Sequence, residues 1–218
     1  MIPRHTWLAG LIAVGAALLA HTAARASDYI LDPQRTVISF ELRSMGATQR
    51  GDFRRAAGAV MLDSTAGVGE LDIVIDAGSL DARNGALTKF VRGPSMLNAA
   101  AHPQIAYKAR RIVFAHGRPV RIEGELTMLG VTRPVPLEIS SYACRGELTA
   151  AERCAIVATA SVKRSEFGMT RYRLLASDDV QLAIHAEGVR PQEAGGGEEA
   201  DPEILSPRRQ DRQGRKGF

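Results

Sequence analysis

The sequence predicts an all-β protein in which antiparallel strands form either a closed barrel or a sandwich. Hydrophobic and polar residues alternate in successive runs between residues 28 and 189, and turn-forming Gly, Pro and Asp residues separate these runs. Only one stretch departs from the two-residue period. Such alternation is typical of strands with one buried and one solvated face. About 160 residues with this pattern predict a single domain.

The runs define eight strands and a further one near the end of the domain. The expected ranges are 35–44, 48–54, 57–63, 69–76, 104–114, 119–128, 133–143, 154–163 and 177–188. Alternation also predicts which side chains face the interior. In four of the strands these are Ile38, Phe40, Leu42, Leu71, Ile73, Ile75, Val120, Ile122, Gly124, Leu126, Val180, Leu182 and Ile184.

Residues 80–101 interrupt the strand pattern. This stretch contains the apolar pairs Ala86-Leu87, Phe90-Val91 and Met96-Leu97. Pairs spaced in this way predict one or two short helical turns lying over an edge of the sheet.

The two ends of the chain differ from its body. Residues 1–26 combine a basic start, an apolar run from Trp7 to Ala20 and the small-residue site Ala24-Arg25-Ala26, which together predict a cleaved secretory signal peptide. An uncleaved membrane anchor is the alternative. Residues 27–189 form the expected domain. Residues 190–218 are rich in Gly, Pro and charge, and are expected to be a disordered tail. The basic end of the tail could touch a membrane surface weakly, or have no fixed role.

Charge gives little support for a nucleic-acid partner. The whole chain carries +4, and loss of Arg4 and Arg25 with the signal leaves +2. Two cysteines, Cys144 and Cys154, remain in the exported chain. Their even number and close spacing in an oxidising compartment favour a disulfide over two free thiols, and no set of metal ligands surrounds them in the sequence.

The sequence offers no enzyme signature, so no catalytic or metal-ligating residue is predicted. The motifs of serine hydrolases, zinc proteases, thiol oxidoreductases and phosphate-binding loops are absent. Polar residues are dense in the segment SVKRSEFGMTRY, residues 161–172. Consecutive residues of a strand point to opposite faces, however, so Lys163 and Arg164 should diverge. The segment is expected to be a strand end with a reversal at Gly168, its Lys and Arg lying on the rim.

A barrel of about eight strands is either filled by side chains or holds one small ligand. The expected inward set is aliphatic and aromatic, which suits a hydrocarbon ligand inside an exported protein. Periodicity alone leaves the filled core and the ligand cavity equally open.

Four stretches together resemble the YceI-like family of polyisoprenoid-binding periplasmic proteins. They are Asp32-Pro33 with Arg50-Gly51-Asp52-Phe53; residues 75–81 with His102-Pro103-Gln104-Ile105-Ala106-Tyr107; residues 124–135, GELTMLGVTRPV; and residues 163–169 with Ser177-Asp178-Asp179-Val180. The resemblance extends from about Tyr29 to Gly188. It implies an antiparallel, eight-stranded, lipocalin-like barrel with a short helical insertion near its mouth. It also implies a periplasmic location, and it strengthens the expectation of a Cys144–Cys154 disulfide.

The resemblance implies that the barrel binds an amphipathic isoprenoid lipid, such as a quinone or a polyprenyl phosphate, without a required cofactor. A ubiquinone-like molecule is one candidate, and a homodimer is plausible for this family. Tyr107 is the inward residue with a polar group that could meet a quinone oxygen. The candidate ligand-binding residues are Ile38, Phe40, Leu42, Phe53, Ile73, Ile75, Ile105, Tyr107, Leu126, Phe167, Val180, Leu182 and Ile184.

Two other functions remain open at this point. The protein could be an interaction module that docks on a membrane redox or stress-response protein through its edge or tail. It could also be an enzyme that modifies a lipid, although this would need an acid–base pair that the sequence does not indicate.

Overall fold

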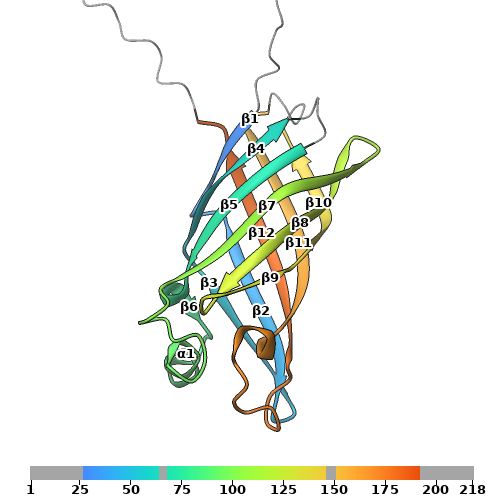
Figure 1. The fold of residues 1–218 in the computed structure, drawn as a ribbon. Coiled ribbons are helices and arrows are strands. Elements are labelled where there is room, and N and C mark those ends of the chain that lie inside the picture. The colour runs from blue at the N-terminus through green and yellow to red at the C-terminus, as the bar shows by residue number, and fades with distance from the viewer. Residues whose placement is uncertain (1–26, 64–67, 146–150, 192–218) are drawn as a thin grey trace, which may run out of the picture.

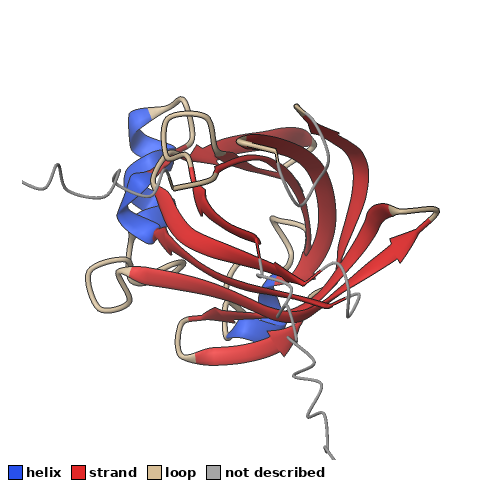
Figure 2. Ribbon diagram, turned by 90° about the horizontal axis from the view of Figure 1, so that it is seen from above, coloured by secondary structure: helices blue, strands red, loops and turns tan. Residues whose placement is uncertain are grey.

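The computed structural model describes residues 27–63, 68–145 and 151–191, and within them the chain forms one antiparallel sheet that closes into a barrel (Figures 1 and 2). Closure comes from two pairings, of Ile30 with Val189 and of Leu31 with Gly188, which join the first and last strands. The eight strands of the ring, in spatial order, are β1 (Ser27–Leu31), β4 (Ala56–Asp63), β5 (Val68–Asp76), β7 (Gln104–Ala115), β8 (Arg118–Met128), β10 (Leu137–Cys144), β11 (Arg153–Lys163) and β12 (Asp179–Val189). The closed barrel expected from the sequence is confirmed, and the sandwich is excluded.

Four further strands extend the sheet at one end of the barrel. The hairpin of β2 (Val37–Ser44) and β3 (Ala47–Phe53) pairs with β12 through β2, and β6 (Leu80–Asp81) pairs with β3. The short strand β9 (Val131–Pro134) folds back on β8. The sequence interpretation missed β1 and β6, and it joined β9 and β10 into one strand over 133–143. These strands are short, so they carry too few alternating residues to stand out.

Alternation predicted the buried face correctly, with one error, in the four strands for which a face was predicted. Ile38 and Phe40 of β2 are buried, as are Leu71, Ile73 and Ile75 of β5. Val120, however, is exposed, and Pro119 is buried in its place. The register of β7 and β8 shifts between Val113 and Phe114, which leaves Val120 as the extra residue of a bulge. A bulge reverses the inside–outside order of the residues beyond it.

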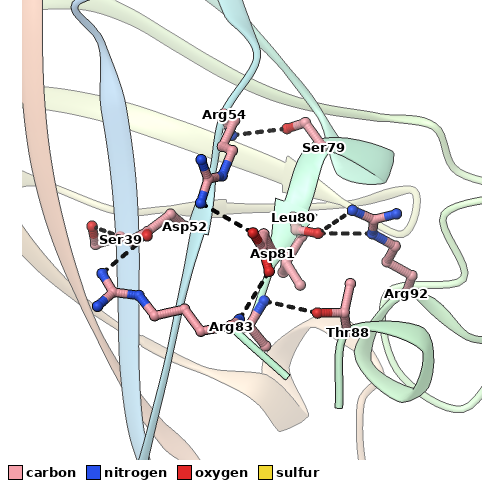
Figure 3. Close-up of polar contacts among 10 residues, drawn as sticks. Ser39, Asp52, Arg54, Ser79, Leu80, Asp81, Arg83, Thr88 and Arg92 are labelled. Atoms are coloured by element: carbon pink, nitrogen blue, oxygen red, sulfur yellow. Dashed lines mark hydrogen bonds and ion pairs between the residues drawn. The ribbon is translucent and has the colours of Figure 1, made fainter. Parts of the chain in front are cut away.

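The interruption at 80–101 contains the helix α1 (Gly85–Arg92), preceded by the 3-10 turn η1 (Ala77–Ser79). The Asn84 side chain caps α1 by accepting a hydrogen bond from the Leu87 backbone amide. The guanidinium of Arg92 donates to the Leu80 carbonyl, and the Thr88 hydroxyl accepts from the Ala82 amide at 3.0 Å (Figure 3). These bonds fasten α1 to β6 at the end of the barrel.

A second polar network joins this end to β2 and β3 (Figure 3). Asp52 of β3 accepts from the Ser39 hydroxyl at 2.8 Å and from the Arg83 guanidinium at 3.2 Å. Asp81 accepts from the Arg54 guanidinium and from the Arg83 amide, at 3.0 and 2.9 Å. The Asp side chains therefore connect three segments that are distant in the sequence.

Arg164 lies inside the protein, and the expectation that it sits on the rim is wrong. Its side chain is 2% exposed, and its guanidinium donates to the carbonyls of Ser177 at 2.8 Å and Ala176 at 3.2 Å. Longer contacts of 3.4 Å reach the carbonyls of Met169 and Arg171. Arg164 thus organises the connection between β11 and β12 by satisfying carbonyls that no strand partner takes.

The rest of the SVKRSEFGMTRY segment agrees better with its sequence pattern. Lys163 is exposed and lies 3.7 Å from Asp179, so it does diverge from Arg164. The turn η2 (Arg164–Phe167) follows at once, and Gly168 ends it in the left-handed conformation, with φ +87°. This is the reversal predicted at that glycine.

Replacing Arg164 by Met should destabilise the protein by about 2–4 kcal/mol, because buried carbonyls lose their donor. The midpoint of urea unfolding measures the change. Lys163→Met is the matched control, since an exposed ion pair contributes at most about 1 kcal/mol. Equal midpoints for the two variants would contradict the structural role of Arg164.

The stability of the β11–β12 connection should also depend on the charge of Asp178. Hydrogen bonds from the Ser165 hydroxyl and amide, at 2.5 and 2.9 Å, hold the pKa of this carboxyl below its ordinary value of 3.8. A folded-state pKa below the unfolded one adds stability above pH 3.8, which is lost as the pH falls further. Asp178→Asn should therefore lower the urea midpoint at pH 7 and reduce its loss below pH 3.8. The exposed neighbour variant Asp179→Asn should leave that acid-dependent loss unchanged.

Candidate functional site

The barrel contains an apolar cavity of about 160 Å³. Side chains from all eight strands of the ring and from β2 line it, and none of the described lining residues carries a charge. Most of the lining lies in the half of the barrel that holds the disulfide and β1, at the top of Figure 1. A hollow with almost wholly apolar walls is chemically suited to a hydrocarbon body.

Seven of the thirteen candidate ligand-binding residues line this cavity. They come from β2, β5, β7, β8 and β12, and they are Ile38, Ile73, Ile75, Tyr107, Leu126, Leu182 and Ile184. The structure therefore brings these seven side chains together around one space. Ligand contact by any of them stays a prediction.

The other six candidates do not line the cavity. Phe40 and Phe53 pack against each other with ring centroids 6.4 Å apart, and Phe167 is 1% exposed. With Leu80 and Leu97, these residues fill the end of the barrel next to α1. Alternation identifies the inward face, but it does not show how far along the barrel the interior is filled. The six residues are Phe40, Leu42, Phe53, Ile105, Phe167 and Val180.

Some lining residues of β7, β8 and β10 were missed because β-bulges change the period, and those of β1 were missed because that strand was not predicted. In β7, the buried residues Ile105, Tyr107 and Ala109 are followed by Ile112, after a register shift between Ala109 and Arg111. A similar shift lies between Ile139 and Ser141 of β10. If a bulge had been assumed at the adjacent arginines 110 and 111, the change of period would have placed Ile112 on the inward face. The lining residues outside the thirteen candidates are Tyr29, Leu31, Thr36, Val60, Leu62, Leu71, Ile112, Phe114, Pro119, Ile122, Val135, Leu137, Ile139, Tyr142, Cys154, Ile156, Ala186 and Gly188. Of these, Leu71 and Ile122 are predicted by alternation to face the interior.

The hydroxyl groups at the cavity wall already have protein partners. The Tyr107 hydroxyl donates to the Val135 carbonyl at 3.0 Å, and the Tyr29 hydroxyl donates to the Ala151 carbonyl at 2.7 Å. Burial raises the pKa of Tyr107 far above its ordinary value, so this group keeps its proton. Its ring lies against the backbone of Gly124, where an added Cβ would stand 2.5 Å from the ring. Tyr107 can offer a ligand its lone pairs, while its proton is committed to Val135.

One cluster of charged groups near the cavity is mutually neutralised, and Arg190 also lies at the cavity wall, with its guanidinium 5.3 Å from the centroid of the Tyr29 ring. At the break between β1 and β2, the Arg153 guanidinium contacts Asp32 at 3.0 Å and also pairs with Glu187. Arg35 approaches Glu187 to within 3.5 Å. The hydrogen bond from Arg153 lowers the pKa of Asp32, so the carboxylate stays ionised. The cluster fixes the bend in the chain and directs no unpaired charge toward the cavity.

The polar residues of 161–172 do not converge on a common point. Lys163 pairs with Asp179, Ser165 bonds to Asp178, and Arg164 is buried among carbonyls. Within 27–63, 68–145 and 151–191, no group of three or more His, Cys, Asp and Glu side chains has a metal-binding arrangement. None of the helices in these ranges is long and apolar enough to cross a membrane.

Cys144 and Cys154 form the predicted disulfide, with a Cα–Cα distance of 4.1 Å. They are directly paired residues of β10 and β11, so the bond clamps the end of this hairpin. Cys154 also lines the cavity. The predicted signal peptide (1–26) lies outside the described residues, and so does the predicted tail from residue 192 onward.

The comparisons with known proteins agree with this architecture. Residues 29–188 match the family model of the YceI-like domain. UPF0312 proteins of Yersinia pestis and of an Enterobacter species are 28% identical over 183 residues, covering 82% of this chain and 95% of each relative. BcnA of Burkholderia cenocepacia is similar in structure, with a TM-score of 0.59 and 21% identity over 72% of this chain and 98% of its own. A polyisoprenoid binding domain from Saccharophagus degradans, implicated in plant cell wall breakdown, has a TM-score of 0.57 and 16% identity, covering 75% of this chain and 98% of that one.

Replacing both cysteines by serine should lower the free energy of unfolding by about 2–3 kcal/mol, as expected for a loop of this length, with a sequence separation of 10. The urea midpoint in the absence of reductant measures the loss. Reductant should lower the midpoint of the wild-type protein by a similar amount and leave the variant unchanged. A variant as stable as the wild type would show that the bond does not stabilise the barrel.

Proposed function

Since the chain belongs to the YceI-like family, we propose that its barrel binds one amphipathic isoprenoid lipid and carries or sequesters it without altering it chemically. The observation that carries this proposal is the uncharged, apolar cavity enclosed by the eight-stranded ring. The polyisoprenoid binding domain of S. degradans shares this barrel fold and supports the choice of ligand class. We further propose that the protein acts in the periplasm, in keeping with the signal sequence expected at residues 1–26.

The cavity can supply affinity by hydrocarbon burial alone. Burial of apolar surface contributes roughly 25 cal/mol per Å². The cavity of about 160 Å³ is smaller than the roughly 300–1,000 Å³ of ordinary ligand pockets, so the lining side chains would move apart when the lipid enters. Branched isoprene units present methyl groups along their length, which suits walls built from Ile, Leu and Val side chains. No charged clamp is needed for the tail.

The polar groups around the cavity favour a neutral head group of the quinone type over a polyprenyl phosphate. No described lining residue is cationic, and the guanidinium of Arg153 is engaged by Asp32 and Glu187. The nearby guanidinium of Arg190 lies over the Tyr29 ring and donates to the Ala151 carbonyl. A phosphate placed among the lining residues themselves would lose its hydration without contacting a cationic side chain. A quinone carbonyl is uncharged and has a smaller desolvation cost, and it would receive a hydrogen bond from Tyr107 only if that hydroxyl turned away from the Val135 carbonyl.

A matched pair of variants tests the proposal. Ala186 of β12 lines the cavity, whereas Ala155 of β11 is exposed on the outside of the barrel. Ala186→Phe should fill the cavity and lower the bound isoprenoid at least tenfold, while Ala155→Phe should retain it. The measurement is mass spectrometry of organic extracts from protein purified after export in its native host.

The wild-type extract should contain close to one isoprenoid per chain, and its mass identifies the head group. An empty extract would overturn the proposal. Full lipid content in a folded Ala186→Phe variant would show that the lipid lies elsewhere. Chemically altered lipid accumulating during incubation would favour the lipid-modifying enzyme instead.

A further inference from the structure

The end of the barrel opposite the disulfide exposes a group of large apolar side chains, which we call the apolar tip. Leu174 is fully exposed, Met45 is 76% exposed, and the others are exposed by more than two-fifths. The apolar tip consists of Met45, Phe90, Tyr172, Leu174 and Leu175. We propose that this tip docks the protein on an anionic lipid bilayer.

Three separate segments build the apolar tip at the lower end of Figure 1, around a hollow of about 660 Å³. Met45, Phe90, Tyr172 and Leu175 line this hollow, and Leu174 lies outside it. Met45 lies in the turn of the β2–β3 hairpin, Phe90 on α1, and residues 172–175 in the connection between η2 and β12. Convergence of three segments on one surface makes the exposure a property of the fold rather than of a single loop.

Hydrogen bonds hold the tip segments in place. The Met45 amide donates to the Leu175 carbonyl at 2.8 Å, and the Ser177 amide donates to the Arg43 carbonyl at 2.7 Å. The rings of Phe90 and Tyr172 meet edge to face, with centroids 5.3 Å apart. The buried guanidinium of Arg164 fastens the same connection from inside through the Ala176 and Ser177 carbonyls. The tip is therefore preorganised, so docking requires little additional ordering.

Cationic side chains surround the apolar tip. Arg43, Lys89, Arg171 and Arg173 are all exposed, and in the described part of the chain none of them lies within ion-pair distance of a carboxylate. The charge of Arg173 is still close enough to Asp178 to contribute to the lowered pKa of that carboxyl. The Arg171 guanidinium donates a hydrogen bond to the Ser95 hydroxyl at 3.2 Å.

The nearby carboxylates are mostly engaged. Glu41 pairs with Arg50 at 2.7 Å and Asp52 with Arg83 at 3.2 Å. Asp178 accepts hydrogen bonds from Ser165, and Glu166 lies exposed on η2. The balance of unpaired charge around the tip is positive.

The apolar tip and the exposed cations beside it match the chemistry of an anionic bilayer. Leucine, methionine and aromatic side chains partition into the region between head groups and acyl chains, while Arg and Lys bind the phosphates. A protein partner or a second copy of this chain would cover the apolar residues equally well. A second copy does not explain the exposed cations, because it would bring like charges together. An acidic protein partner is the alternative that an absence of vesicle binding would favour.

This docking mode gives the barrel a definite orientation. With the apolar tip in the bilayer, the filled end next to α1 faces the membrane, and the cavity half with Cys144 and Cys154 faces the aqueous phase. The inference is independent of the lipid proposed for the cavity, because the tip residues do not line that cavity.

Vesicle flotation of the exported, purified chain tests the inference. The probes are vesicles of phosphatidylglycerol mixed with phosphatidylethanolamine, and vesicles of phosphatidylcholine. Leu174→Ser combined with Leu175→Ser should lower binding to the anionic vesicles at least tenfold. The control combines Met61→Ser with Val120→Ser, which removes exposed apolar groups away from the tip and should leave binding unchanged. All variants retain residues 192–218, so any contribution of that segment is the same in each.

Charge is tested separately. Arg171→Gln combined with Arg173→Gln should weaken binding to the anionic vesicles severalfold and make that binding less dependent on salt concentration. Binding to phosphatidylcholine vesicles should not change. Absence of wild-type binding to anionic vesicles, equal binding to both vesicle types, or unchanged binding of the Leu variant would overturn the inference. So would a Leu variant that changes the oligomeric state, by light scattering, while binding vesicles as the wild type does.

Discussion

The barrel depends on the path of β12. One edge of this strand pairs with both β1 and β2, which follow each other in the sequence. Its final residues pair with β1, and residues 181–185 pair with β2. Between them, the Asp32 amide donates to the Glu187 carbonyl at 2.7 Å, and Arg153 binds both side chains. This bend lets β1 turn toward β4 and close the ring while β2 continues into its hairpin with β3.

The bend divides the barrel into two halves with different interiors. Where β1 closes the ring, aliphatic side chains surround the cavity. Where β2, β3 and β6 continue the sheet, Phe40, Phe53 and Phe167 fill the interior and α1 lies over the end. A cavity open along the whole barrel would lose the packing contacts of these aromatic side chains, and such contacts stabilise the folded state. The filled half thus supports the hollow one.

Arg164 has a similar supporting role for the surface at the filled end. A buried guanidinium is costly unless its donors are satisfied, and here the carbonyls of a strand connection satisfy them. That connection carries Tyr172, Leu174 and Leu175 into solvent. The buried, charged Arg164 therefore fixes the position of exposed apolar side chains, whereas charged residues are usually exposed and apolar ones buried.

The sequence by itself determined the all-β class, most of the inward face of four strands, the turn at Gly168, and, through its motifs, the family and the disulfide partners. These follow from local rules, because a strand repeats every two residues and a positive φ favours glycine. Only the tertiary structure decided the bulges near Arg110 and Val120, the burial of Arg164, and the division between cavity and filled core. Those features depend on register and on contacts between distant strands, for which a run of alternating residues gives no signal.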